Sequence, residues 1–239
     1  MRVFVDFDGT ITTQDVGSMV FRSLGGAEAE EAIVAYRAGV ISARECFLRA
    51  ARAIGSVELK NIEELVDAQR VDPGFKDFVQ FCNSHDVELC VLSDGLDYSL
   101  ERILTANGMS GIVRFSNVMT MTPVDFNKKF RMQLEFPHEN PECDRCACCV
   151  RNVMLTRSGD EDFIVYVGEG YSGRCPSGFA DLVFAKDQLQ SYCQQENISY
   201  LPYRTFFDVE SGVKRLLLKK HLRPRHRAAL QRAATFIAE

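Results

Sequence analysis

The stretch RVFVDFDGT at residues 2–10 decides the fold, because it joins a buried strand to a turn that carries two carboxylates. Residues 2–7 are mostly apolar, β-branched or aromatic, which is typical of a strand buried on both faces of a sheet. Asp6 and Asp8 lie two residues apart on an extended chain, so their side chains point the same way. Gly9 permits the tight turn that follows. Asp-x-Asp-Gly is also an ordinary turn signal, and these residues alone leave both interpretations open.

Strands alternate with helices along most of the remaining chain. Apolar runs predict strands at 87–92, 163–167 and 182–185, with a strand and hairpin over 112–136. Helical patterns fall between and after them, near residues 75–83, 96–107, 150–157, 187–195 and 208–220. This alternation predicts an α/β fold with a Rossmann-like parallel sheet covered on both faces.

Residues 16–66 have a different character, with three segments of helical periodicity and few strand signals. Ser42 and Glu45 are spaced as a capping box and open the second segment. We therefore predict a small helical unit inserted after the first strand. The expected boundaries are 1–14 and 71–220 for the α/β core, 15–70 for the helical unit, 114–149 for a hairpin and Cys-rich insertion, and 221–239 for a basic tail.

Three predicted strands end in polar turns that contain glycine, at residues 6–10, 93–95 and 168–170. Ligands of parallel α/β sheets bind beyond the carboxyl ends of the strands, so these turns are expected to converge. Phosphoryl transfer needs what they supply: a carboxylate nucleophile, a second carboxyl as acid and base, and oxygen ligands for Mg²⁺. The hydroxyl of Thr10 is available for phosphate.

The string DFDGT directly after an apolar strand resembles the first motif of the haloacid dehalogenase (HAD) superfamily. The resemblance implies a HAD core in which Asp6 is the nucleophile and Asp8 the general acid/base. It implies Mg²⁺ held by Asp6, by the backbone carbonyl of Asp8 and by Glu169. Ser93 matches the second motif, a hydroxyl on phosphate, with Asp94 and Gly95 beside it. The helical insertion lies where the superfamily has its substrate-sealing cap.

Within the superfamily the chain resembles the phosphoserine-phosphatase-like branch. The segment SDGLDYSLERIL at 93–104 is similar to that of the methionine-salvage phosphatases for hydroxyketomethylthiopentenyl phosphate. The Cys-rich segment also resembles the phosphoethanolamine and phosphocholine phosphatases. Asp15 matches a substrate-contacting acid of phosphoserine phosphatases, although Asp is equally suited to cap a helix.

The chain departs from the superfamily pattern in two places, the fourth motif and the position of a phosphate-pairing Lys. The fourth motif has Glu169 and Gly173 where two Asp are usual. A Lys that pairs with phosphate is replaced by Val150, which leaves Arg151 or Arg174 to supply the charge. An Arg is not equivalent to a Lys. The resemblance therefore implies a Mg²⁺-dependent phosphomonoesterase for a small phosphorylated metabolite, and the alternative is a degenerate phosphate- or metabolite-binding protein with little turnover.

Four of the nine cysteines crowd into seven residues, with a histidine upstream: Cys143, Cys146, Cys148, Cys149 and His138. Thiolate and imidazole ligands at short spacings are typical of a structural Zn²⁺ site. Adjacent cysteines do not easily reach one tetrahedral ion together, so buried thiols or a disulfide are the alternatives.

Composition and charge limit the classes of partner. The chain has 239 residues, 46% of them hydrophobic, and a net charge of −5, which gives no overall footprint for nucleic acid. No apolar run approaches the roughly 18 residues of a membrane span, and the first residues lack a secretory pattern. We predict a cytoplasmic monomer or homodimer without nucleic acid or membrane partners. Residues 219–239 hold six Lys or Arg and one Glu, which suits either a binding arm or a solvated helix broken at Pro224.

Overall fold

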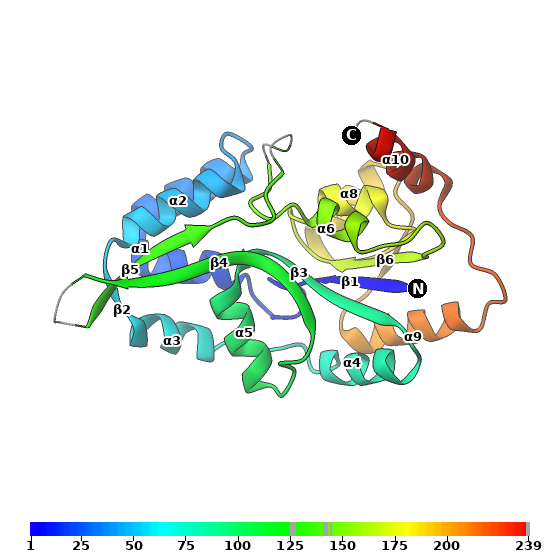
Figure 1. Cartoon of the computed structure of the whole chain (residues 1–239), viewed down its shortest axis with the longest axis horizontal. Coiled ribbons are helices and arrows are strands. Elements are labelled where there is room, and N and C mark those ends of the chain that lie inside the picture. The colour runs from blue at the N-terminus through cyan, green and yellow to red at the C-terminus, as the bar shows by residue number, and fades with distance from the viewer. Residues whose placement is uncertain (125–127, 141–142, 144, 238–239) are drawn as a thin grey trace.

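A computed structural model describes residues 1–124, 128–140, 143 and 145–237 of the chain (Figure 1). Its sheet has the strand order β2-β5-β4-β3-β1-β6-β7-β8. The strands from β4 to β8 in this order are parallel to their neighbours, whereas β5 is antiparallel to β4 and β2 is antiparallel to β5. Their bounds are β1 Arg2–Asp6, β2 Val57–Glu58, β3 Glu88–Leu96, β4 Val113–Pro123, β5 Lys129–Glu135, β6 Ile164–Gly168, β7 Leu182–Ala185 and β8 Tyr200–Pro202.

Helices cover both faces of the parallel sheet, as the alternating sequence pattern predicts (Figure 1). One face carries α4 (Phe75–Ser84), α5 (Asp97–Ala106) and α9 (Phe206–Leu217). The other carries α6 (Val150–Thr156), α7 (Arg174–Phe179) and α8 (Asp187–Gln195). The first strand serves both layers, because Val3 and Val5 belong to the core of the first face and Phe4 to that of the second. The α/β prediction is confirmed.

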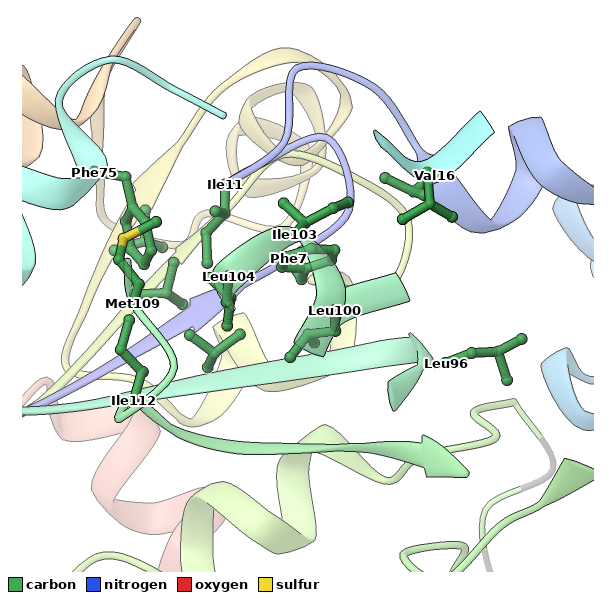
Figure 2. Packing of buried hydrophobic residues seen from close by; sticks show 14 of the residues in the cluster. Phe7, Ile11, Val16, Phe75, Leu96, Leu100, Ile103, Leu104, Met109 and Ile112 are labelled. Atoms are coloured by element: carbon green, nitrogen blue, oxygen red, sulfur yellow. The ribbon is translucent and has the colours of Figure 1, made fainter. Parts of the chain in front are cut away.

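The larger core lies between the sheet and the first helical layer (Figure 2). Phe75 and Phe206 meet edge to face there, with ring centroids 4.8 Å apart. Ile11 and Phe7, which flank the turn after β1, are also fully buried in it. The turn that carries Asp6 and Asp8 is thus anchored on both sides by core residues, which holds the two carboxylates in place.

Strand β3 differs from its prediction. It was expected to end at Leu92, with Ser93, Asp94 and Gly95 in a turn, but the strand runs on to Leu96. The pairing of β3 with β4 shifts register between Leu92 and Leu96. This irregularity turns the Ser93 segment toward the end of β1. The short elements β8 and α7 had no corresponding prediction.

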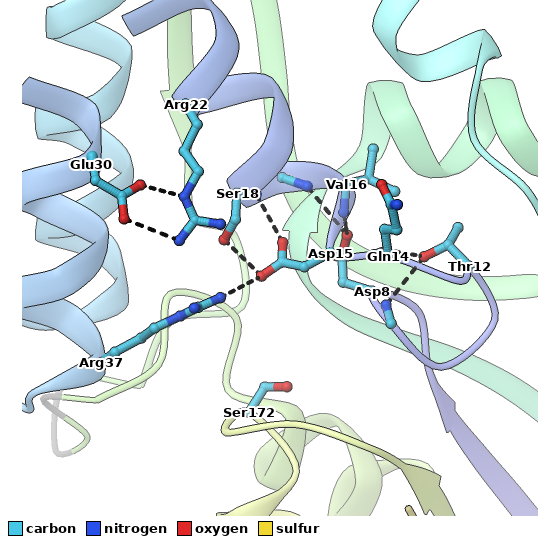
Figure 3. Close-up of polar contacts among 12 residues, drawn as sticks. Asp8, Thr12, Gln14, Asp15, Val16, Ser18, Arg22, Glu30, Arg37 and Ser172 are labelled. Carbon is cyan, nitrogen blue, oxygen red and sulfur yellow. Dashed lines mark hydrogen bonds and ion pairs between the residues drawn. The ribbon is translucent and has the colours of Figure 1, made fainter. Parts of the chain in front are cut away.

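The helical insertion after β1 contains α1 (Val16–Arg37), α2 (Ala43–Ile54) and α3 (Leu59–Asp67). Helix α1 is broken at Gly26, whose backbone has φ 59° and ψ −141°. A straight helix of 22 residues would be about 33 Å long, yet its two ends meet, since Arg37 pairs with Asp15. Helix α1 is therefore a helical hairpin, and Figure 3 shows its halves side by side, joined also by Arg22 and Glu30.

The basic tail forms α10 (His226–Ile237), which packs on α7 rather than extending freely. Ala228 is fully buried, and Arg232 pairs with the buried Asp181 at 3.0 Å. Arg225, just before the helix, donates to the carbonyls of Ser177 and Gly178. The tail is therefore a helix that begins after Pro224, with one face packed on α7 and much of the rest exposed. No helix in the part of the chain that the structure describes is long and apolar enough to cross a membrane.

Candidate active site

The carboxylate of Asp6 stands at the end of β1 and is 3% exposed. The backbone N–H of Phe7 donates to its Oδ1 at 3.0 Å. The hydroxyls of Thr10 and Ser172 donate to its Oδ2 at 3.5 and 3.3 Å. Burial raises the pKa of Asp6, and the nearby negative charges of Asp8 and Glu169 raise it further. Its donors fix the direction of the carboxylate, and no Lys or Arg among the described residues forms an ion pair with it.

The carboxyl of Asp8 is held by the start of α1. The backbone N–H groups of Val16 and Gly17 donate to its Oδ1 at 2.8 and 3.3 Å, and the Ser93 hydroxyl donates to Oδ2 at 3.3 Å. Burial and the neighbouring Asp15 raise the pKa of Asp8 to about 7. A carboxyl that exchanges its proton near neutral pH is suited to act as both acid and base.

Two glycines let the loops at this edge of the sheet come together. A Cβ on Gly95 would lie 2.6 Å from Oδ2 of Asp8. A Cβ on Gly9, which has φ 69°, would lie 2.4 Å from Oε1 of Glu169. The carboxylate of Glu169 therefore rests against the turn after β1. The longer side chain at this position reaches the same site as Asp6, and burial followed by the charge of Asp187 raises its pKa.

Asp94 faces the Cys-rich loop. Its Oδ1 accepts the backbone N–H groups of Ala147 and Cys148 at 2.8 and 2.6 Å. Burial nevertheless raises the pKa of Asp94 to about 7. The side chain also lines the pocket above Asp6, so it positions the loop while its charge acts on whatever the pocket holds.

Asp15 caps α1 and pairs with the end of the same helix. It accepts the N–H and the hydroxyl of Ser18 at 2.8 and 2.6 Å, so the expected N-cap is present (Figure 3). Its Oδ2 also accepts from Nη2 of Arg37 at 3.5 Å. The two functions considered for Asp15 are compatible, because the capping residue lies on the wall of the pocket.

A cavity of about 150 Å³ opens above the carboxylates, between the sheet edge and the helical insertion. We call it the acidic pocket, because its lining contains Asp6, Asp8, Asp15, Asp94 and Glu169. Arg37 is the one Lys or Arg among the described residues that line it. Its apolar wall comes from the insertion and includes Phe21, Ile33 and Phe47.

The acidic pocket has the donor chemistry for a hard divalent cation. Asp6 and Glu169 supply carboxylate oxygens, and neither has an ion-pair partner among the residues that the structure describes. The Asp8 side chain is turned toward α1 and Ser93, so only its main-chain carbonyl is left for a metal. This explains why the described residues contain no group of three or more acidic, Cys or His side chains able to hold a metal.

Arg151 does not reach the acidic pocket. Val150, at the position of the expected Lys, is 2% exposed and packs in the core under α6. The Arg151 guanidinium lies over the Phe179 ring and lines a separate cavity with Arg174. In this structure α6 and α7 direct both side chains to the separate cavity, so neither arginine lines the acidic pocket.

The cysteine cluster contains no disulfide, because all nine cysteines are free. The thiols of Cys146 and Cys149 lie within hydrogen-bond reach of Cys143 and lower its pKa. The backbone carbonyl of His138 accepts the N–H of Cys149 at 2.8 Å, while its ring meets Phe115 edge to face at 5.2 Å. Cys148 is fully buried, with its N–H on Asp94. The described residues thus show a thiol cluster that positions the loop at Asp94, and they do not support structural Zn²⁺.

Several pocket residues were not predicted from the sequence, among them Arg37, Tyr171 and Ser172. Tyr171 and Ser172 lie inside the fourth motif, between Glu169 and Gly173. The motif is recognised by its acidic positions, so it does not single out these two residues. Arg37 belongs to no motif. Its only sequence signal is the Gly-Gly pair at 25–26, which marks the reversal of α1.

Comparisons with known proteins bear on the family and the fold. A family model described as "Putative Phosphatase" matches residues 1–199. Among solved structures, a phospho-aspartyl intermediate analogue of phosphoserine phosphatase has a TM-score of 0.67, with 14% identity and coverage of 88% of this chain and 97% of that one. A HAD family hydrolase from Salmonella enterica serovar Typhi has a TM-score of 0.66 with 15% identity, covering 92% and 72%. These structures establish the fold.

The chain therefore belongs to the putative phosphatase family and is a phosphatase. Its fold is that of the HAD-fold phosphatases, with a phosphoserine phosphatase among its structural neighbours. More particularly, it is similar to the 2-hydroxy-3-keto-5-methylthiopentenyl-1-phosphate phosphatases of Bacillus thuringiensis (strain Al Hakam) and Bacillus cereus (strain 03BB102). Each is 28% identical over 223 residues, which are 91% of this chain and 97% of the relative. The predicted superfamily, branch and enzyme class are confirmed.

Proposed function

We propose that the protein is a Mg²⁺-dependent phosphomonoester hydrolase that acts on a small phosphorylated metabolite through an aspartyl-phosphate on Asp6. The observation that carries this proposal is the pair at the end of β1. Asp6 is oriented by three donors, and Asp8 beside it has a pKa raised to about 7. The nine free thiols suit a reducing compartment and support the cytoplasmic location.

In this proposal Asp6 is the nucleophile, and Asp8 acts first as an acid and then as a base. An oxygen of Asp6 attacks phosphorus, and the P–O bond to the leaving alcohol breaks as Asp8 gives that oxygen its proton. Water then attacks the phosphorus of the aspartyl-phosphate and passes a proton to Asp8, which releases phosphate and restores Asp6. Arg37 is the cation of the pocket that meets the phosphoryl charge.

The metal would be held by the carboxylates of Asp6 and Glu169 and by the main-chain carbonyl of Asp8. When bound, Mg²⁺ supplies the positive charge that offsets the phosphate and the crowded carboxylates. A metal bound at the carbonyl of Asp8 would leave the hydrogen bonds described above in place, because none of those bonds uses that carbonyl.

The first test is hydrolysis of an aryl phosphate by the purified full chain with added Mg²⁺. We expect phosphate release, and a protein-bound phosphate in the quenched reaction that hydroxylamine removes, as an acyl phosphate requires. Asp6→Asn should lack both signals, whereas Asp160→Asn, on an exposed loop, should retain them. A phosphoenzyme resistant to hydroxylamine would contradict the proposed nucleophile.

The substrate proposed is a phosphate ester with an apolar tail. The insertion presents Phe21, Ile33 and Phe47 to the pocket, and the Bacillus relatives are named for a methylthiopentenyl phosphate. We expect this ester, with its thioether tail, to have a higher kcat/KM than phosphoserine. Phe47→Ser should reduce the difference in kcat/KM between the two esters. Equal kcat/KM values for both esters in the wild type would contradict an apolar tail.

A second candidate is a phosphate- or metabolite-binding protein with little turnover. The departures at Glu169, Gly173 and Val150 favour it, because no cation from α6 reaches the pocket. Glu169→Asp tests this possibility with the smallest change. A large gain in turnover from nearly nothing would support the binding protein, and a loss would support a working Glu169. Gly173→Asp is less informative, since a Cβ there meets Leu189 at 3.0 Å.

A further inference from the structure

A second cavity, of about 420 Å³, is lined by residues from α6, α7, α8 and the start of α10. We call it the arginine groove, because five arginines line it: Arg145, Arg151, Arg174, Arg225 and Arg227. Glu196 is the one acidic residue among its described lining residues. The groove shares no lining residue with the acidic pocket and has no part in the proposed hydrolysis.

Among the described residues, Arg151, Arg174 and Arg227 have no carboxylate within ion-pair distance. Arg225 donates to two backbone carbonyls, at 2.8 and 2.6 Å, and Arg227 donates to the carbonyl of Glu196 at 2.9 Å. Arg151 donates to the neutral side chain of Asn152 at 3.4 Å. Asp181 accepts the backbone N–H of Arg225 at 3.1 Å, and its charge offsets part of the charge of that arginine. The described side chains therefore leave most of the positive charge of the groove unneutralised.

Several guanidinium nitrogens of the groove are buried without any hydrogen bond. They are Nε of Arg151, Nε of Arg174, and both Nε and Nη1 of Arg225. A buried donor without an acceptor costs about 1–3 kcal/mol, and more when it is charged. Native proteins rarely leave such groups unpaired, so each one calls for an acceptor that the described residues do not provide.

Aromatic rings hold two of the guanidinium groups in place. The Cζ of Arg174 lies 4.5 Å from the ring centroid of Tyr171 and 5.4 Å from that of Tyr192. The Cζ of Arg151 lies 5.6 Å from the Phe179 centroid. Stacked in this way, the guanidinium groups lose less side-chain entropy when they bind an anion, so the groove is partly preorganised.

The charge balance selects the class of anion. Five arginines and one glutamate give the groove a charge of +4, and a thiolate at Cys143 would still leave +3. A single phosphate monoester carries only about −1.5 to −2 at neutral pH. We propose that the arginine groove is a binding site for a small oligophosphate anion, with at least two linked phosphoryl groups in contact with Arg151, Arg174, Arg225 and Arg227. Arginine forks bind phosphate oxygens bidentately, which supplies the missing acceptors.

Calorimetric titration of the full chain in a buffer with a chelator tests this proposal. Without a divalent cation the acidic pocket repels anions, so the signal reports the groove. The probes are inorganic tripolyphosphate, ATP and inorganic phosphate. We expect one tripolyphosphate per chain and much weaker binding of inorganic phosphate. Equal affinities for tripolyphosphate and ATP would identify the phosphate chain alone as the ligand, and a higher affinity for ATP would add its nucleoside.

The variant Arg151→Gln/Arg227→Gln should weaken tripolyphosphate binding about 10²-fold or more, because two charge-assisted contacts are removed. Arg215→Gln is the matched control, since Arg215 is an exposed arginine on α9 outside the groove. No saturable binding by the wild type would overturn the proposal, as would equal losses in both variants. Binding of an oligoribonucleotide but of neither small oligophosphate would also overturn it, in favour of a nucleic-acid surface.

Discussion

The acidic pocket and the arginine groove have opposite charge. Among the described residues, the acidic pocket is lined by five carboxylates and a single arginine, and the arginine groove by five arginines and a single carboxylate. An acidic pocket attracts a phosphate ester only after a cation offsets its charge, whereas the groove attracts an anion directly. In the proposed reaction, the cavity that contains the nucleophile is therefore the one that needs a metal, and the groove takes no part.

The two cavities are linked by one stack of side chains. Tyr171 lines the acidic pocket, where its ring meets that of Tyr36 at 5.3 Å, and Arg174 covers its other side. Substitutions that act on one cavity alone test how independent the two are. The following predictions are ordered from the largest effect to the smallest.

The largest effect is expected from loss of the nucleophile. Asp6→Asn removes the attacking oxygen while it leaves an amide that still accepts hydrogen bonds. We expect kcat to fall by at least about 10³-fold, as when other covalent nucleophiles are removed. Oligophosphate binding in the groove should stay the same. Calorimetry and phosphate release on the same preparation check both, and an equal loss of binding would show that the cavities are not separate.

Removal of divalent cations should affect the acidic pocket almost as strongly. A chelator leaves the carboxylates around Asp6 without a counter-charge, and we expect turnover to fall by about 10²–10³-fold. Readdition of Mg²⁺ should restore the rate and raise the melting temperature, because a ligand of the native state stabilises it. Turnover that survives exhaustive chelation would argue against the metal in the proposed reaction.

Arg37→Gln removes the positive charge of the acidic pocket. We expect kcat/KM to fall by about 10–10²-fold, mainly through KM, since one charged hydrogen bond contributes about 1.5–3 kcal/mol. Arg22→Gln is the control, because Arg22 lies on the same hairpin and pairs with Glu30 outside the pocket lining. Similar losses in both variants would assign the effect to the hairpin rather than to the charge.

The smallest effect concerns stability and pH. Folding raises the pKa of Asp8 from 3.8 to about 7. The contribution of Asp8 to the free energy of unfolding is therefore fully present below about pH 4 and is lost as the pH rises through about 7. Asp8→Asn removes the titrating carboxyl, so this loss of stability with rising pH does not occur. The Asn side-chain oxygen can still accept the N–H groups of Val16 and Gly17. In metal-free buffer we expect the melting temperature of the variant, relative to wild type, to be higher at pH 8 than at pH 5. For a chain of this size about 2–4 °C corresponds to 1 kcal/mol. An equal difference in melting temperature between the variant and the wild type at both pH values would contradict the raised pKa of Asp8.

Local chemistry made the first strand and its carboxylates predictable. Val3, Phe4 and Val5 need burial on both faces, and Asp6 with Gly9 marks the strand end, so neighbours along the chain contain the whole signal. The alternation of later strands and helices likewise follows from local patterns. The same was true of the Asp15 cap, whose partner Ser18 is three residues away.

Residues whose direction depends on packing were not predictable. Val150 and Arg151 are neighbours on α6, and only the docking of that helix decides which one faces the core. Arg37 meets Asp15 across 22 residues, through a reversal that no periodicity reports. The extension of β3 to Leu96 depends on its pairing with β4. In each case the deciding contact is distant in sequence.

The reversal of α1 makes the position of Arg37 in the acidic pocket depend on Gly26, a residue that does not line the pocket. Gly26 has φ 59° and ψ −141°, a conformation that is essentially restricted to glycine. Any other residue there favours an opened hairpin, which would carry Arg37 away from Asp15 and leave the acidic pocket without its arginine. A homologue can therefore keep every pocket residue and still lose its phosphate-binding charge through position 26.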